Sequence, residues 1–220
     1  MQGWLIQGFR KTNHLQPPLH SFFKSAINLK LMKTSSRNIV LLCTILMIGA
    51  FFLPFWKIIL EAPQYPEGLE MKIWLYKITG DVDKINGLNH YIGMKLIHED
   101  EFPEFKIMPW ALGLLIAFGV MSALLRKRAL LWAWISALVA AGAIAFVDFY
   151  QWLYDYGHNL NPHAAIKVPG MSYQPPMLGY KQLLNFLAGS FPDIGGYFVI
   201  IAAAGILTIA VYEQFYRKSK

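Results

Sequence analysis

Four long apolar segments, separated by polar stretches, dominate the pattern along the chain. They cover residues 39–55, 108–125, 129–147 and 197–215. A helix needs about 20 residues to cross the hydrocarbon of a bilayer, and each segment comes close to that length. The pattern therefore predicts an integral membrane protein with four transmembrane helices.

The four spans divide the remaining residues into five segments. We expect a cytoplasmic arm at 1–38, a first extracytoplasmic loop at 56–107, a cytoplasmic turn at 126–128, a second extracytoplasmic loop at 148–196 and a cytoplasmic tail at 216–220. Both loops are far longer than the roughly 4–6 residues of a simple connection. We therefore predict an all-α membrane protein with four transmembrane helices, whose two long extracytoplasmic loops pack together as a small α+β cap.

Shorter patterns within the loops predict the elements of this cap. Partial alternation over 70–79 predicts a short strand. Asp83 is a candidate N-cap, and the apolar residues that recur every three or four positions after it predict an amphipathic helix from about Lys84 to His98. In the second loop, residues 161–179 are rich in Pro and Gly, and residues 181–187 are expected to form a short helical piece.

Positive charge gathers at the ends that the four spans share, and this predicts their orientation. The segments assigned to the cytoplasm, taken with Glu213, hold twelve cations and one acid, whereas the two outer loops carry net charges of −3 and −1. Because Lys and Arg collect on the cytoplasmic side, we expect both termini inside and the chain in the cytoplasmic (inner) membrane. Topology and attraction to anionic lipid thus explain the net charge of +7. We expect the lipid bilayer as a partner and no nucleic acid.

The first 31 residues contain no apolar run long enough to cross a membrane. From Met32 onward the sequence reads as an ordinary beginning of a membrane protein. Two interpretations stay open: residues 1–31 are a cytoplasmic arm, or translation begins at Met32. Under either interpretation we expect residues 1–31 to be dispensable.

Composition and motifs argue against an enzyme. Apolar residues make up 55% of the chain and charged residues 15%, and the one cysteine, Cys43, lies inside the first apolar segment. The chain has no nucleophile elbow, metalloprotease helix motif, phosphate-binding loop or haem-attachment motif. We therefore predict a non-enzymatic protein with no catalytic residues.

Three residues of the first loop form a candidate metal site: His90, Met94 and His98 follow one another at a spacing of four. On a helix this spacing places the side chains on successive turns of one face, opposite the apolar stripe. Two imidazoles and a thioether favour copper, above all Cu(I). His158 and Met171 of the second loop are weaker candidates for a further ligand. The alternative interpretation is a polar helix face that contacts a partner, with no metal.

Two motifs of the first loop carry a resemblance to a known family. The runs APQYPEGL at 62–69 and INGLNHYIGM at 85–94 resemble those of small multi-span membrane proteins that accompany nitrous-oxide reductase gene clusters. His90 and Met94 fall inside the second motif, whereas His98, His158 and Met171 do not. The resemblance implies an accessory role in maturing a periplasmic copper enzyme, or in supplying it with copper or electrons.

Two functions therefore remain open at the level of the sequence. The first is a membrane accessory protein that holds or transfers copper for a periplasmic copper protein such as nitrous-oxide reductase, or docks it. The alternative is a scaffolding or assembly subunit that contacts membrane partner subunits without metal. A transporter is disfavoured, because the spans contain no broken helices or mid-membrane polar residues.

Overall fold

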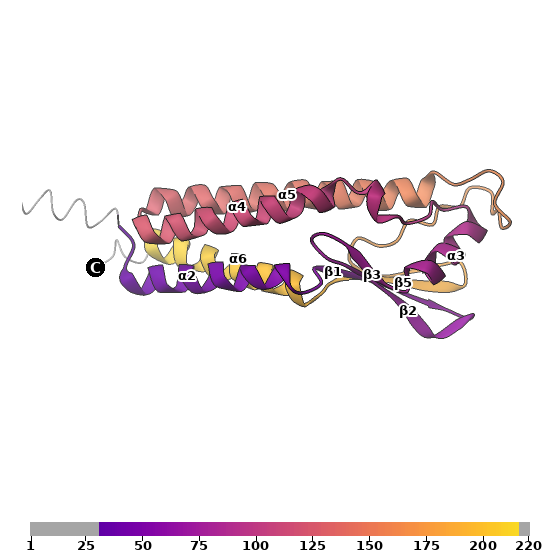
Figure 1. The fold of residues 1–220 in the computed structure, drawn as a ribbon, viewed down its shortest axis with the longest axis horizontal. Helices are drawn as coiled ribbons and strands as arrows, with labels where there is room; N and C mark the ends of the chain where they lie inside the picture. The colour runs from indigo at the N-terminus through magenta and orange to yellow at the C-terminus, as the bar shows by residue number, and fades with distance from the viewer. Residues whose placement is uncertain (1–30, 216–220) are drawn as a thin grey trace, which may run out of the picture.

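The computed structural model describes residues 31–215, and within them four long helices form a bundle at one end of the molecule (Figure 1). The helices are α2 (Thr34–Ile48, extended by the 3-10 turn η1, Gly49–Phe51), α4 (Glu104–Leu125), α5 (Arg128–His158) and α6 (Ile194–Phe215). All four are long and apolar enough to cross a membrane. The chain is a membrane protein with four candidate transmembrane helices.

A buried tryptophan shows why two of the helices approach closely. Trp134 of α5 is fully buried, and its indole N–H donates to the Leu115 carbonyl of α4 at 2.7 Å. A Cβ at Gly119 would lie 2.3 Å from the Trp134 ring. Only glycine at that position lets the ring lie against the α4 backbone, which places α4 and α5 in contact.

A buried carboxylate joins three helices at the end of the bundle where the described chain begins and ends. Glu213 of α6 is 1% exposed. It accepts hydrogen bonds from the Ser36 hydroxyl at 2.6 Å and the Lys33 amide at 2.9 Å, and Arg128 of α5 forms an ion pair with it at 3.0 Å. Groups from three distant parts of the chain therefore meet at one point.

The residues before α2 are held against the α4–α5 turn at the same end. The Met32 amide donates to the Arg126 carbonyl at 2.7 Å, the Arg126 guanidinium donates to the Met32 carbonyl at 2.9 Å, and Leu31 pairs with Lys127. Residues 1–30 lie outside the described residues, so the expectation that residues 1–31 are dispensable stays a prediction.

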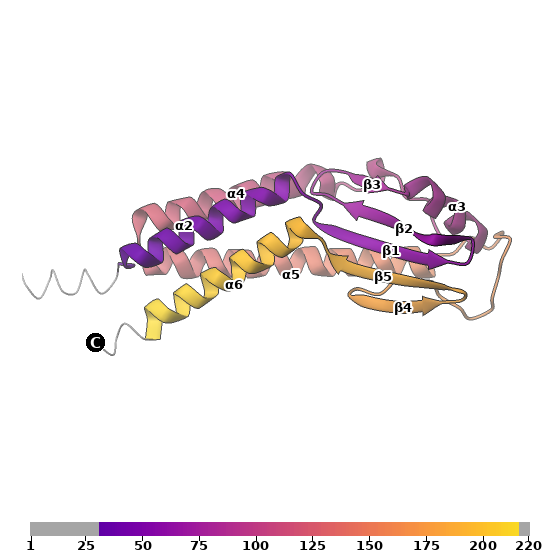
Figure 2. The same cartoon turned by 90° about the horizontal axis from the view of Figure 1, so that it is seen from below.

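The opposite end of the molecule is a sheet domain, and this overturns the predicted all-α class. Five antiparallel strands lie in the order β3-β2-β1-β5-β4 (Figure 2). Their bounds are β1 Trp56–Ala62, β2 Tyr65–Ile73, β3 Ile78–Gly80, β4 Gly179–Leu183 and β5 Phe186–Pro192. The all-α prediction failed for two reasons. β1 closely follows the first span and continues its apolar sequence, and its partner strand β5 comes from the other loop.

The pairing of β1 with β5 unites the two loops. Ile58 lies opposite Ser190 and Leu60 opposite Ala188, and the Trp56 indole donates to the Ser190 hydroxyl at 2.8 Å. The prediction that the loops pack together is thereby confirmed. The predicted helical piece at 181–187 is wrong: these residues form the end of β4, the hairpin turn and the start of β5, and the turn holds Leu184 at a φ of 54°.

One face of the sheet packs against α3 (Val82–Ile92) and the last turns of α5. Leu153 and Tyr156 of α5 join a buried cluster with Ile58 and Met71 of the sheet. At about 1.5 Å per residue, the 31 residues of α5 extend over roughly 46 Å, well beyond the hydrocarbon of a bilayer. The helix therefore continues past residue 147, where we expected the span to end, and supports the sheet domain.

The helix of the first loop is shorter than its pattern predicts. α3 ends at Ile92, because Gly93 has a left-handed φ of 81°. A Cβ there would lie 2.8 Å from the Ala164 Cβ and 3.0 Å from the Asn161 carbonyl oxygen. At the other end Asp81, not Asp83, is the N-cap residue; its hydrogen bond from Lys84 lowers the pKa of its carboxyl.

Candidate functional site

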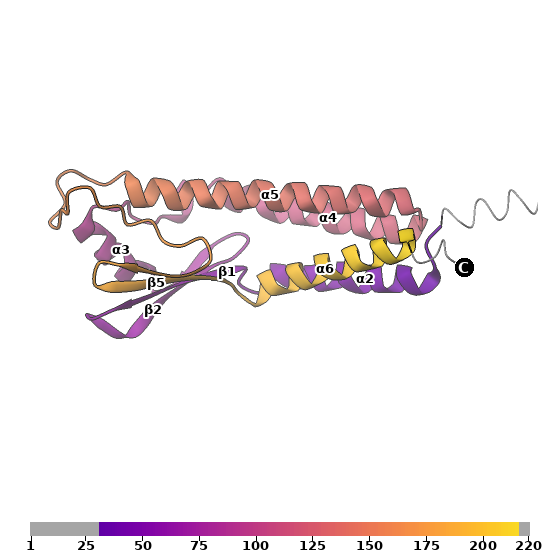
Figure 3. The ribbon, with the colours of Figure 1, turned by 180° about the vertical axis from the view of Figure 1, so that it is seen from behind.

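The candidate site is a groove between the end of α3 and the segment after α5. Both elements lie at the end of the molecule farthest from α2 and α6 (Figure 3). It has a volume of about 340 Å³, within the range of small-ligand pockets. One wall comes from the end of α3 and the other from the segment after α5. The residues used below are His90, Met94, Lys95, Asn159 and Asn161.

Backbone hydrogen bonds hold the two walls together. The Asn161 amide donates to the Gly93 carbonyl at 2.7 Å, and the Ile166 amide donates to the Tyr91 carbonyl at 2.9 Å. Because the left-handed Gly93 ends α3 here, the chain turns and presents its carbonyl to the second loop. The groove therefore depends on both loops.

An ion pair borders the groove. The Lys95 ammonium pairs with the Asp155 carboxylate, and the Asn159 side-chain amide donates to the same carboxylate. Lys95 and Asp155 come from the first and second loops. The pair neutralises the acid that lies nearest to the groove along α5.

The structure brings together two of the three leading metal candidates. His90 is exposed in the last turn of α3, and Met94 follows Gly93 with its amide bonded to the Asn89 carbonyl at 2.9 Å. Both line the groove. His98 does not line it; it is the extended residue before the short turn η2 (Glu99–Glu101). The premise of one shared helical face is wrong, since α3 stops six residues before His98.

The weaker candidates lie outside the groove. His158 is the last residue of α5, where its ring stacks on Tyr154 with centroids 3.9 Å apart and its Nδ1 lies 3.0 Å from the Tyr154 carbonyl oxygen. Met171 is exposed in the second loop, with its amide bonded to the Val168 carbonyl. Within residues 31–215, no three side chains of the His, Cys, Asp and Glu types gather as a metal site.

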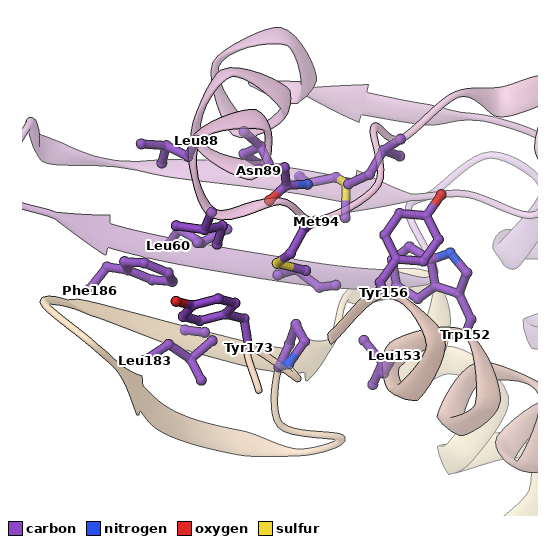
Figure 4. Close-up of a pocket in the computed structure, with 17 residues that line it drawn as sticks. Leu60, Leu88, Asn89, Met94, Trp152, Leu153, Tyr156, Tyr173, Leu183 and Phe186 are labelled. Atoms are coloured by element: carbon purple, nitrogen blue, oxygen red, sulfur yellow. The ribbon is translucent and has the colours of Figure 1, made fainter. Parts of the chain in front are cut away.

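An apolar cavity of about 40 Å³ lies beneath the groove, between α3, α5 and the sheet. Met94 lines both spaces, and Met71 of β2 lines the cavity with it. In Figure 4, Asn89 and Met94 approach from the side of α3, and Tyr173 and Leu183 approach from the side of the second loop. Tyr173 is 1% exposed, and within the described chain its hydroxyl has no hydrogen-bond partner.

Several residues of the site were not expected from the sequence. Asn159 and Asn161 follow the end of α5, and Asn161-Pro162 is a common turn signal, which was the one usable clue. Met71 and Tyr173 carry no local signal of this kind, because only the packing of the two loops brings them together. What the arrangement offers chemically is one imidazole, one thioether and several amide groups in a shared groove.

No family model matches this chain, and a comparison with curated proteins finds no match.

Proposed function

We propose that this chain is an accessory protein of the cytoplasmic membrane that serves a periplasmic copper enzyme such as nitrous-oxide reductase. In this role the chain either helps to mature the enzyme or supplies it with copper or electrons. The charge distribution supports an orientation with both termini in the cytoplasm. The sheet domain and its groove then face the periplasm.

The observation that carries the proposal is the groove. Both His90 and Met94, which belong to the motif at 85–94, line it. The groove lies at the end of the molecule farthest from α2 and α6 (Figure 3). An imidazole and a thioether form a set of donors that Cu(I) accepts readily. With only two such donors the site holds the ion loosely. Loose binding suits transfer to a partner better than storage.

A metal-free scaffolding subunit is the second candidate, and one observation favours it. The nearest histidine along the chain, His98, does not line the groove, so the third donor that we expected is not supplied there. In this function the same end of the domain contacts the enzyme or a membrane partner subunit and no ion is transferred. The two candidates predict different behaviour towards copper.

A copper titration distinguishes them. Detergent-solubilised full chain is titrated with Cu(I) under anaerobic, reducing conditions in competition with a Cu(I) chelator. We expect about one copper ion per chain, and an affinity at least about tenfold lower for His90→Ala, because a site with two donors has no spare ligand. His163→Ala is the matched control, since His163 is exposed nearby and does not line the groove.

A second experiment tests the accessory role itself. In cells that lack this chain, turnover of nitrous oxide is measured in the intact cells, and nitrous-oxide reductase is then purified and its copper content is measured. Low copper content is the result expected for maturation, and full copper content with low turnover is the result expected for electron supply. A fully loaded and fully active enzyme would contradict the accessory role. If the wild-type chain binds no copper and the reductase is impaired in cells that lack the chain, the metal-free scaffolding subunit is the remaining candidate.

A further inference from the structure

Exposed apolar side chains lie on the part of the second loop that directly follows α5 and at the end of α3, far from the helix bundle. We name this surface the distal patch; it consists of Tyr91, Ile166, Val168 and Met171, which are 58%, 48%, 41% and 37% exposed. The Ile166 amide donates to the Tyr91 carbonyl at 2.9 Å, and the Met171 amide donates to the Val168 carbonyl at 3.1 Å. The first bond joins the two loops at the patch, and the second closes a turn between Val168 and Met171.

The bilayer that holds the bundle does not cover this patch. α5 continues for eleven residues after residue 147, which adds about 16 Å at 1.5 Å per residue. Three of its four residues belong to the loop that follows α5, and this loop extends beyond the end of the helix (Figure 1). Exposed apolar side chains on the bundle are explained by lipid, whereas those of the distal patch need another partner.

The loop that carries the patch is anchored on both sides. Asn161 is bonded to Gly93 before the patch, and after it the Tyr173 amide donates to the Gly157 carbonyl at 2.9 Å. A side chain would not fit at Gly157, because a Cβ there would lie 2.3 Å from the Gln174 backbone. A surface held in place in this way loses little conformational entropy on binding.

The two stretches of sequence that carry the patch contain basic residues and no acidic residue. Residues 156–192 contain Lys167 and Lys181 and no acid, and residues 84–98 likewise contain lysines and no acid. Asp155, which directly precedes the stretch 156–192, is paired with Lys95 of the stretch 84–98. A second copy of this chain would bring like charges together in a two-fold interface, which is unfavourable.

We propose that the distal patch binds a soluble protein with an acidic surface surrounding an apolar centre. Apolar burial at Ile166 and Val168 supplies affinity, and Lys167 between them supplies charge complementarity. The proposal rests on the proposed function in one respect only: the sheet domain faces the periplasm. The identity of the partner then shows whether the accessory role is also correct.

Site-specific photocrosslinking in intact cells tests the proposal. Benzoylphenylalanine is placed at position 168 in the full chain, and in a control chain at Gln182, which is exposed on the edge strand β4. Crosslinked products are identified by mass spectrometry. We expect position 168, and not position 182, to crosslink a soluble protein with an acidic surface.

A charge reversal makes the test sharper. Lys167→Glu should lower the crosslink yield at position 168 by about fivefold or more, because it places like charges opposite each other. Lys106→Glu, an exposed reversal at the start of α4, should leave the yield unchanged. Equal accumulation of the three chains and equal resistance to protease confirm that they fold alike.

The other outcomes overturn the proposal. These are crosslinks to a second copy or to lipid, a yield at position 168 no higher than at position 182, or no effect of Lys167→Glu. If the crosslinked partner is acidic but is neither a copper enzyme nor a component of its maturation, the distal patch stands and the proposed accessory role fails.

Discussion

At the scale of single residues, the chain places buried polar groups in two contrasting situations. The carboxylate of Glu213 has donors from three sources, whereas the Tyr173 hydroxyl has none within the described residues. A satisfied buried group costs little to keep, and an unsatisfied one costs its full desolvation penalty. The two residues therefore respond oppositely when their polar atoms are removed.

Removal of the Glu213 carboxylate should destabilise the bundle strongly. Glu213→Leu leaves the Arg128 guanidinium without its partner at a site where Arg128 is 12% exposed. We expect a loss of about 3–5 kcal/mol in the free energy of unfolding in detergent, typical of a broken buried ion pair. The double variant Glu213→Leu with Arg128→Leu should recover much of this loss. Additive effects of the two substitutions would contradict the network.

Removal of the Tyr173 hydroxyl should have the reverse sign. Tyr173→Phe keeps the ring in the apolar cavity and eliminates the unpartnered group, so we expect the free energy of unfolding to rise by about 1 kcal/mol. Tyr156→Phe is the matched control, because the Tyr156 hydroxyl donates to the Leu96 carbonyl at 3.2 Å. That variant should lose about 1 kcal/mol. A loss for both would show that the Tyr173 hydroxyl is satisfied in solution.

At the scale of elements, two glycines of the same helix region have opposite roles. Gly93 has a left-handed φ and no room for a Cβ, whereas Gly87 lies within α3 with nothing within 4 Å of a Cβ. Gly93→Ala should lower the free energy of unfolding by about 1–3 kcal/mol. Gly87→Ala should raise it by about 0.5–1 kcal/mol, as for glycine in a helix interior. Similar effects at both positions would mean that α3 does not end at Ile92.

The same region explains which elements could be predicted from the sequence. The four spans follow from local composition, and so their existence was predictable from residues such as those of 108–125. The sheet was not, because Trp56 and Ser190 are separated by 134 positions and local alternation says nothing about such a pairing. The periodicity after Lys84 continues past Gly93, where the left-handed backbone and the close contact with Asn161 end the helix.

The candidate site, too, could be predicted from the sequence only in part. The residue types of His90 and Met94 were visible in the sequence, and the groove contains both. The expected third donor, His98, was placed wrongly because its position depended on a continuous helix. Asn159 and Asn161 enter the groove through the tertiary contact between the loops, which no local pattern contains.

At the scale of the whole molecule, the bundle and the sheet domain define two ends with different chemistry. Lys33, Arg37 and residues 126–128 lie at the bundle end, together with both ends of the described chain. The groove and the distal patch lie at the other end. Every functional statement about the sheet domain depends on which of these ends faces the periplasm.

Cysteine labelling can decide the orientation, because the chain has a favourable background. Its one cysteine, Cys43, is 8% exposed within α2, so the unaltered chain should react poorly with a membrane-impermeant maleimide. We expect Gln182→Cys to be labelled in intact spheroplasts, since its side chain is exposed on β4. Lys127→Cys, in the turn between α4 and α5, should be labelled only after the membrane is permeabilised. The reverse pattern would place the groove in the cytoplasm, where a periplasmic copper enzyme could not reach it.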